Sequence, residues 1–241
     1  MKTALVTGAS SGIGEAAARR LDADGWRLIL VARRADRLEA LAGELRDATA
    51  LPLDLTAADA PAAAAAAAGD RLDLLVNNAG ASWRASFEEG GWDNVRRTME
   101  INFDAVVRLT EALLPALRAA APSALVNVSS IAGRVARARS GAYNASKFAL
   151  AGWTDALRPE EKRHGVHVGL VLPGFVSTEG FPQSELTRSA RTRWTVSTPE
   201  KVADAIVRAA GGRAEVAVPR PWALLPRLRY GAPGLFRRAA G

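Results

Sequence analysis

The sequence of 241 residues contains no cysteine and only two histidines, His164 and His167. The absence of cysteine excludes disulfide bonds, thiolate zinc sites, iron–sulfur clusters and a cysteine nucleophile. A metal site would need further ligands that converge with the two histidines, and no such spacing is present. We therefore predict no metal centre.

Long apolar runs are also missing. The alanine-dominated run Ala60–Gly69, like every other charge-free run, is shorter than the roughly 18 apolar residues that a membrane-spanning helix needs. The first apolar stretch, Thr3–Thr7, is too short for a signal peptide and lacks a cleavage site. The sequence therefore predicts a cytoplasmic protein, and the alanine run itself predicts a plain helix.

Acidic residues are absent from the C-terminal segment, residues 219–241, which carries five arginines. The whole chain has 32 basic and 25 acidic residues and a net charge of +7, so most of the excess lies in this tail. The rest of the chain is nearly neutral and has no basic stripe interleaved with aromatic residues. We therefore predict no binding to nucleic acid.

The same tail mixes its arginines with large apolar residues such as Trp222 and Phe236. It is expected to pack beside the active site or a neighbouring subunit, or to rest on an anionic membrane surface. Pro221, Pro226 and Pro233 interrupt any long amphipathic helix, which makes membrane contact the weaker alternative.

Short apolar runs alternate with longer amphipathic stretches along the chain. Most of the seven short runs are continuously apolar, which predicts strands buried on both faces. These runs are Ala4–Val6, Arg27–Val31, Ala48–Leu53, Leu72–Val76, Ala124–Val128, Val166–Leu172 and Glu215–Val218. The helical stretches are Gly12–Asp24, Ala35–Leu45, Ala57–Ala68, Trp92–Ala120, Ser140–Arg163 and Pro199–Gly211. This order predicts an α/β fold, a doubly wound Rossmann fold with a seven-stranded parallel sheet and helices on both faces.

We expect residues 1–218 to form a single Rossmann-type catalytic domain and residues 219–241 to form the Arg-rich tail. Within the domain, the stretch Ser177–Thr198 is long for a loop, and such loops are often lids or binding segments. Its arginines Arg188, Arg191 and Arg193 could attract an acidic substrate, although a solvated surface is the simpler interpretation.

A glycine-rich turn follows the first predicted strand and opens the first helix. Glycines let the backbone turn tightly and approach a pyrophosphate, whose charge is met by amides at the helix N-terminus. No Lys-Ser/Thr pair follows the turn, so a P-loop for nucleoside triphosphates is excluded. The predicted dinucleotide contacts in this turn are Gly8, Ser10, Ser11, Gly12, Ile13 and Gly14.

The end of the second predicted strand indicates which dinucleotide is bound. An NAD-specific site usually has an acid there to accept hydrogen bonds from the ribose. Here the strand ends in Val31-Ala32-Arg33-Arg34, and a guanidinium can pair bidentately with a 2′-phosphate. Arg33 and Arg34 therefore favour NADP over NAD, the alternative being a solvated first turn of the next helix.

Ser130, Tyr143 and Lys147 form the candidate catalytic set. Tyr143 and Lys147 are four residues apart in a predicted helix and so share one face. Ser130 ends a buried strand, where open parallel sheets have their active sites. An ammonium group beside a phenol favours the phenolate, which would make Tyr143 a usable proton donor or acceptor.

Together these motifs resemble those of the single-domain short-chain dehydrogenases/reductases, over nearly all of residues 3–218. The likeness rests on Thr7–Gly14, Asn77-Asn78-Ala79-Gly80, Asn102, Ser130 with Tyr143 and Lys147, and Pro173-Gly174-Phe175-Val176-Ser177-Thr178. The separations of 28 residues from Asn102 to Ser130 and of 13 residues from Ser130 to Tyr143 also fit the family.

The resemblance implies a role for each matched residue. Tyr143 would be the general acid in reduction or the base in oxidation, while Ser130 holds the substrate oxygen. Lys147 would bind the nicotinamide ribose and lower the pKa of the phenol. Asn102 would sit at a break in its helix and keep a water in a proton relay.

The resemblance also adds residues to the predicted cofactor site, and it places the selection between NAD and NADP at the end of the second predicted strand. The contacts it adds are Asp54 and Leu55 at the adenine, Asn78, Ala79 and Gly80 on the adenosine side, and Pro173, Gly174, Val176 and Thr178 toward the nicotinamide. The family's NAD-selecting acid is replaced by Ala32, directly before Arg33.

One departure from the family concerns the helix that contains Tyr143. The chain reads Leu157-Arg158-Pro159 where the family often has a Glu-Leu pair. Proline cannot donate an amide inside a helix, so we expect the helix to end or kink there.

The sequence therefore predicts an NADP(H)-dependent oxidoreductase acting on a small carbonyl or secondary alcohol, assembled as a homodimer or homotetramer as is common in the family. An NAD-dependent alcohol dehydrogenase is the alternative within enzymes. A catalytically silent dinucleotide-binding regulator or scaffold is the alternative outside them, and the complete set of Asn102, Ser130, Tyr143 and Lys147 opposes it.

Overall fold

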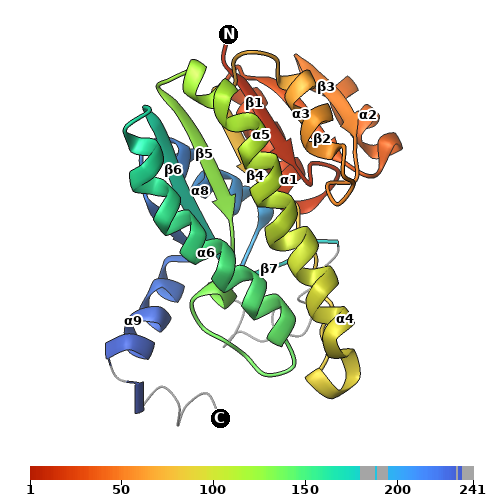
Figure 1. The fold of residues 1–241 in the computed structure, drawn as a ribbon. Helices are drawn as coiled ribbons and strands as arrows, with labels where there is room; N and C mark the ends of the chain where they lie inside the picture. The colour runs from red at the N-terminus through yellow and green to blue at the C-terminus, as the bar shows by residue number, and fades with distance from the viewer. Residues whose placement is uncertain (180–187, 189–194, 232, 235–241) are drawn as a thin grey trace.

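The computed structural model describes residues 1–179, 188, 195–231 and 233–234. Seven parallel strands from this part of the chain form one twisted sheet (Figure 1). In spatial order they are β3 (Ala48–Pro52), β2 (Arg27–Ala32), β1 (Thr3–Thr7), β4 (Leu74–Asn77), β5 (Ser123–Val128), β6 (Val166–Pro173) and β9 (Glu215–Val218). The predicted doubly wound, seven-stranded sheet is confirmed.

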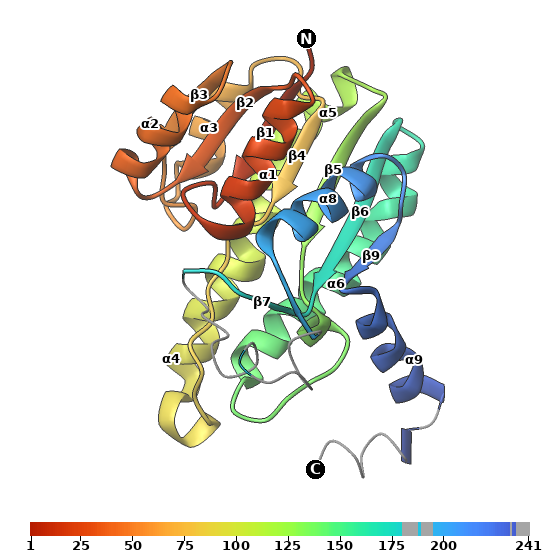
Figure 2. The same ribbon diagram turned by 180° about the vertical axis from the view of Figure 1, so that it is seen from behind.

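Helices cover both faces of the sheet, as Figures 1 and 2 show from opposite sides. One face packs against α1 (Gly12–Ala23), α2 (Ala35–Glu44) and α8 (Pro199–Ala210). The other face packs against α3 (Ala60–Ala68), α5 (Ala105–Ala119) and α6 (Gly141–Lys162). Each predicted helix is present, with ends shifted by a few residues.

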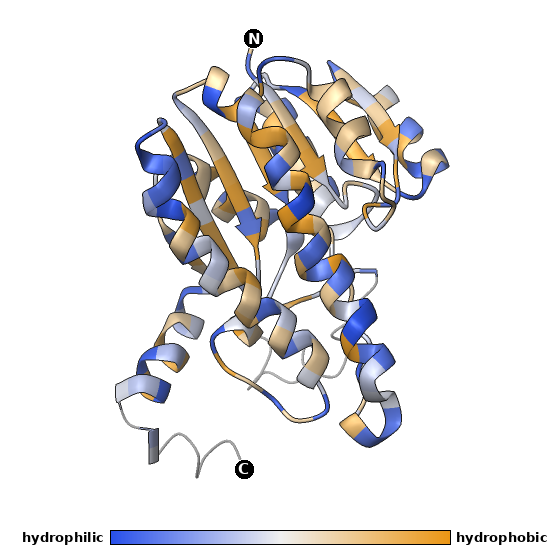
Figure 3. Ribbon diagram, in the orientation of Figure 1, coloured by the Kyte–Doolittle hydropathy of each residue, from blue (hydrophilic) through white to orange (hydrophobic). Residues whose placement is uncertain are grey.

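The central strands are largely apolar because most of their side chains meet a helix layer on one face or the other (Figure 3). In β1, Ala4 and Val6 point into one core cluster and Leu5 into the other, and all three are fully buried. Alternate side chains of a strand therefore supply both cores.

The order of the strands reverses between β1 and β4, which lie side by side at the centre of the sheet. The chain winds outward from β1 in one direction through β2 and β3, and from β4 in the other. In open parallel sheets a ligand crevice lies outside the carboxyl ends of the strands at such a switch point.

The predicted helix Trp92–Ala120 consists of three consecutive pieces. The first, α4 (Phe87–Met99), opens with a short turn capped by Ser86 and Glu89: Ser86 Oγ accepts from the Glu89 amide at 3.2 Å and Glu89 Oε2 accepts from the Ser86 amide at 2.8 Å. Gly91, with φ 51° and ψ −154°, is not helical and separates this turn from the helix that starts at Trp92, as predicted. The π-helical segment η1 (Glu100–Asp104) then joins α4 to α5.

The expected end of α6 at Pro159 is wrong, because the helix runs on to Lys162, and the alternative of a kink there stays a prediction. Packing on both sides of the proline holds the last turn in place. Leu157, which is 7% exposed, belongs to the core cluster, and buried Glu161 accepts two hydrogen bonds from Arg118 of α5, at 2.6 and 2.9 Å. These contacts outweigh the single backbone hydrogen bond that proline removes.

The C-terminal tail begins with the 3-10 segment η4 (Arg220–Ala223) and continues as α9 (Leu224–Gly231). Trp222 and Leu225 pack against a small core cluster that includes Ile131, at the end of the sheet where the strands terminate. In this structure the start of the tail thus packs against its own domain, while contact with a neighbouring subunit or a membrane surface stays a prediction; residues 235–241 lie outside the described part.

Within the residues that the structure describes, no helix is both long and apolar enough to cross a membrane. Most of the predicted loop Ser177–Thr198, including Arg191 and Arg193, lies outside those residues. The residues just before this loop and those near its end form a short parallel pair of strands, β7 (Phe175–Val176) and β8 (Val196–Ser197).

The pairing of Arg118 with Glu161 generates a stability prediction. Replacing Arg118 by Met leaves a carboxylate that is 3% exposed without its partner. Breaking a fully buried pair costs about 3–5 kcal/mol, and we expect about 1–3 kcal/mol here because the arginine side chain is 42% exposed. Chemical denaturation at pH 7 measures this loss.

Two controls separate charge from packing. The double variant Arg118→Met/Glu161→Met should regain most of the stability, because no unpaired charge remains. Arg118 lowers the pKa of Glu161, so the pair stabilises the fold above the ordinary glutamate pKa and this contribution disappears as the pH falls through the lowered pKa. A single variant as stable as the wild type at pH 7 would contradict the assignment.

Candidate active site

The glycine-rich turn lies at the end of β1, where the chain crosses itself with no space for side chains. Gly8 and Gly12 have φ values of 68° and 59°, a region that disfavours residues with a Cβ. A Cβ on Gly14 would lie 2.1 Å from the Gly8 carbonyl oxygen, and a Cβ on Gly8 would lie 2.9 Å from Asn78 Nδ2. Only glycine fits at these positions.

Thr7 and Asn78 hold the end of β4 beside this turn. Thr7 Oγ1 donates to the Val76 carbonyl at 3.2 Å and accepts from the amides of Asn78 and Ala79, at 2.9 and 3.0 Å. Asn78 Nδ2 donates to the Thr7 carbonyl at 2.9 Å. The backbone of Asn78–Gly80 is thereby fixed next to the glycine turn.

Two arginines stand at the end of β2, on the outer side of the glycine turn. Arg34 donates to the hydroxyls of Ser10 and Ser11, at 3.0 and 2.7 Å, so its guanidinium lies over the turn. Arg33 is exposed beside Asp54. The pKa of Asp54 is lowered chiefly by hydrogen bonds from the amide and hydroxyl of Thr56, and further by the charge of Arg33.

Ser130 and Tyr143 meet beyond the end of β5. Ser130 Oγ donates to the Pro173 carbonyl at 3.3 Å and accepts from the Ala132 amide at 3.1 Å, which fixes the hydroxyl. Burial raises the pKa of the Tyr143 phenol, while its hydrogen bond with Ser130 and the charge of Arg137 act in the opposite direction. The two side chains therefore form one hydrogen-bonded unit.

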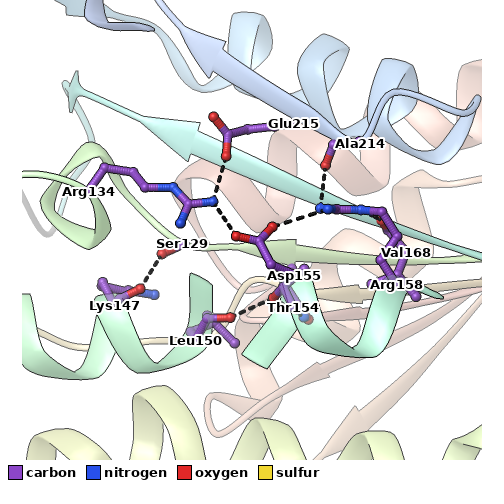
Figure 4. A network of polar contacts seen from close by, with 11 residues as sticks. Ser129, Arg134, Lys147, Leu150, Thr154, Asp155, Arg158, Val168, Ala214 and Glu215 are labelled. Atoms are coloured by element: carbon purple, nitrogen blue, oxygen red, sulfur yellow. Dashed lines mark hydrogen bonds and ion pairs between the residues drawn. The ribbon is translucent and has the colours of Figure 1, made fainter. Parts of the chain in front are cut away.

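Lys147 lies one turn further along α6 and is only 4% exposed. Its Nζ donates to the Val128 carbonyl at 3.1 Å, and its own carbonyl accepts from Ser129 Oγ at 2.9 Å (Figure 4). Burial lowers the pKa of Lys147 to about 8. Nζ also lies over the Tyr143 ring, 5.8 Å from its centre, and the expected lowering of the Tyr143 pKa by Lys147 stays a prediction.

Asn102 lies in the π-helical segment, where a break in the helix was expected, and is fully buried. Its side chain exchanges two hydrogen bonds of 2.9 Å with the main chain of Ala81 and donates to Ser146 Oγ at 3.0 Å. Ser146 in turn donates to the Tyr143 carbonyl at 2.9 Å. Asn102 thus braces α6 against the segment after β4, and its part in a water relay stays a prediction.

These groups border one continuous cleft of about 1420 Å³ at the carboxyl ends of the strands. That volume exceeds the roughly 300–1,000 Å³ of most small-molecule pockets and accommodates a dinucleotide with a second ligand. The predicted site residues that line it are Gly8, Ser10, Ser11, Gly12, Ile13, Arg33, Arg34, Asp54, Leu55, Asn78, Ala79, Gly80, Ser130, Tyr143, Lys147, Pro173, Gly174, Val176 and Thr178. Gly14 and Asn102 lie behind the wall.

The structure adds residues in and behind the cleft wall that the motifs did not identify. Ser129 and Ser146 support Lys147 and Asn102, and a signal for both was available in their positions next to matched residues. Arg137 lies in the segment between β5 and α6, where no motif marks it, and only the folded chain brings it to Tyr143.

Comparison with known proteins agrees with this geometry. Residues 2–188 match the family described as short chain dehydrogenase, which is well over half of the chain. The chain belongs to the short-chain dehydrogenase family. The members of this family are oxidoreductases that bind a nicotinamide dinucleotide, so the resemblance seen in the motifs is confirmed at the level of the family.

Individual members of the short-chain dehydrogenase family are similar over most of the chain. Dehydrogenase/reductase SDR family member 7B of Bos taurus is 35% identical, with 97% of this chain and 78% of that protein aligned. A short-chain dehydrogenase from Streptomyces avermitilis is 31% identical with a TM-score of 0.80, covering 97% of this chain and 98% of that one. RhlG of Pseudomonas aeruginosa, solved as an NADP active-site complex, is 28% identical with a TM-score of 0.78, covering 90% and 94%.

Burial of Lys147 makes the stability of this short-chain dehydrogenase depend on pH. Its folded pKa of about 8 lies below the ordinary value of 10.5, so the unfolded chain binds more protons between these values and stability rises with pH there. From pH 7 to pH 10 the wild type should gain roughly 2 kcal/mol over the variant Lys147→Met. Denaturant unfolding of both proteins at several pH values measures the difference.

The comparison with Lys147→Met cancels the titration of every other group that the substitution leaves unchanged. Lys162→Met serves as the matched control, because Lys162 is exposed at the end of the same helix and should show no such pH-dependent difference. A constant difference between wild type and Lys147→Met across this range would overturn the lowered pKa.

Proposed function

We propose that the protein is an NADP(H)-dependent oxidoreductase that transfers hydride between the nicotinamide and a carbonyl or secondary alcohol. The observation that carries this proposal is the placement of Ser130, Tyr143 and Lys147 on one wall of a cleft that begins at the glycine turn. Ser130 and Tyr143 would act at the reacting oxygen, with Tyr143 as the source of the proton. The cleft is long enough for a dinucleotide bound at the glycine turn to reach them.

The glycine turn fits the pyrophosphate of such a cofactor. A Cβ at Gly12 would lie 3.2 Å from the Thr178 side chain. Only a glycine there leaves the backbone amides at the start of α1 accessible to a ligand. Bound in this cleft, NADP(H) would supply the hydride. Gly8, Ser10, Ser11 and the following amides would hold its phosphates.

Tyr143 would give its proton to the carbonyl oxygen in reduction and take it back in oxidation. Burial keeps the phenol protonated at neutral pH, which is the form required of an acid. The phenolate that remains after transfer is stabilised by the hydrogen bond with Ser130 and by the charge of Arg137. Ser130, placed by the Ala132 amide, would turn its single proton from the Pro173 carbonyl to the substrate oxygen.

Lys147 lines the cleft beside Tyr143 and Gly80. Its ammonium donates to the Val128 carbonyl and lies over the Tyr143 ring. That placement supports a role in binding the cofactor's ribose hydroxyls. Burial lowers the pKa of Lys147 to about 8, and the negative charge of a bound cofactor would favour the charged form of the amine.

The choice of NADP rests on the arginines at the end of β2. No carboxylate stands at Ala32, and both Arg33 and Arg34 line the cleft there. Arg34 is already oriented by Ser10 and Ser11, whose hydroxyls can join it on a phosphate. The NADP complex of the similar RhlG supports the same choice.

Removal of the Tyr143 hydroxyl tests the proposed chemistry. The variant Tyr143→Phe should lose about 10²-fold or more in turnover of a neutral aldehyde with NADPH, because the acid placed beside the reacting oxygen is lost. Its affinity for NADPH should be unchanged, since the ring is kept. Stopped-flow oxidation of NADPH and a separate fluorescence titration measure the two quantities. Unaltered turnover would exclude Tyr143 as the acid.

A second experiment tests the cofactor. Arg33→Ala should weaken NADPH binding about tenfold or more and leave NADH binding unchanged, because only NADPH carries the phosphate. Arg37→Ala is the matched control. Arg37 lies in the first turn of α2, four residues after Arg33, pairs with Glu179 and does not line the cleft. Tighter binding of NADH by the wild type would favour an NAD-dependent alcohol dehydrogenase, and binding of cofactor without any turnover would favour a regulator or scaffold.

A further inference from the structure

The part of the cleft beyond Tyr143 has a composition that the dinucleotide does not explain. Its lining comes from the segment after β4, the end of α4, the segment before α6, Phe175 of β7 and the C-terminal tail. We call this part of the cleft the substrate half. It contains three arginines, Arg84, Arg97 and Arg137, and Glu100 lines the cleft one helical turn after Arg97.

The body of the substrate half is apolar and aromatic. Trp222 stacks edge-on against Phe175, with ring centres 5.4 Å apart, and its indole Nε1 donates to the Thr195 carbonyl at 3.0 Å. Leu225 and Leu228 of α9 continue the same wall. A ligand with an apolar body would therefore be held close to Ser130 and Tyr143.

Arg137 stands against this apolar wall. Its guanidinium lies over the Phe175 ring, 5.4 Å from the ring centre. The Arg137 carbonyl accepts from Asn144 Nδ2 at 2.8 Å, which fixes the backbone that presents it. The charge is close enough to affect the Tyr143 phenol, so a group bound to Arg137 would lie near the reacting centre.

Neighbouring arginines show what is unusual about Arg137. Arg134 pairs with Asp155 and Glu215, both at 2.7 Å (Figure 4), and Arg139 pairs with Glu89 at 2.8 Å. Among the described residues, no carboxylate lies within ion-pair distance of Arg137 or of Arg84, which lines the same half. Desolvation has the largest effect on the pKa of Arg137 and lowers it, and the like charge of Arg84 lowers it further.

From this juxtaposition we propose that the substrate is a carbonyl compound with an apolar body and an anionic group, a carboxylate or a phosphate ester, which pairs with Arg137. A guanidinium binds both kinds of anion through two parallel hydrogen bonds. An anion there would also relieve the repulsion between Arg137 and Arg84. The inference rests on the proposed function for the carbonyl, but the anion site itself does not require turnover.

A matched pair of aldehydes tests the proposal by activity. 4-Carboxybenzaldehyde and its methyl ester have the same reacting group and differ in the charge. The wild type should favour the acid in kcat/KM, and Arg137→Met should reduce the acid-to-ester ratio about tenfold or more. Any effect of Arg137 on Tyr143 acts on both aldehydes and cancels in the ratio. Arg139→Met, whose arginine pairs with Glu89 outside the cleft lining, should leave the ratio unchanged.

A binding measurement separates this proposal from the proposed function. Calorimetric titration of the NADP-loaded protein with 2-naphthoate and with 2-naphthyl phosphate should show binding of at least one, about tenfold weaker in Arg137→Met and partly restored in Arg137→Lys. Which anion binds more tightly identifies its chemical source. Anion binding without turnover of any aldehyde would overturn the proposed function and keep the site. Turnover of the ester with no anion bound, or an unchanged ratio, would overturn the site.

Discussion

The backbone crossing at the end of β1 is the constraint on which the site depends. Gly14 packs against the Gly8 carbonyl, and Asn78 fills the remaining space, so three chain segments meet with no room for another atom. The meeting point lies at the reversal of strand order, which leaves the crevice open above it. A sheet with the same strands but a side chain at either glycine would have to move its first helix or its fourth strand.

A second constraint is the burial of a cation behind the reactive phenol. Lys147 is surrounded by the core, keeps a hydrogen bond to the main chain of β5 and has a pKa well below its ordinary value. Such an arrangement costs stability in the folded chain and places a strong donor next to the cleft. Asn102 and Ser129, through Ser146 and the Lys147 carbonyl, hold the same stretch of α6 from two sides.

Much of this architecture could be predicted from the sequence because it depends on local patterns. Continuous apolar runs identified the strands, and the glycine turn, Ser130, Tyr143 and Lys147 stood at fixed distances along the chain. What could not be predicted depended on distant contacts: α6 continues past Pro159 because Arg118 holds Glu161, and the Lys147 ammonium over the Tyr143 ring donates to the Val128 carbonyl. Arg137 has no motif, and its surroundings exist only after β7 and the tail have folded against it.

The wall formed by Trp222 has a consequence for how such an enzyme could change over evolutionary time. The indole packs so closely on Gly174 that a Cβ there would lie 2.6 Å from Nε1, and the same nitrogen binds Thr195 at the far end of the preceding loop. The tail comes after the last strand of the sheet and packs against a cluster that includes Leu170 and Leu172 of β6, far along the chain from the glycine turn. New preferences for an apolar ligand can therefore arise by replacement of these tail residues without a change in the glycine turn.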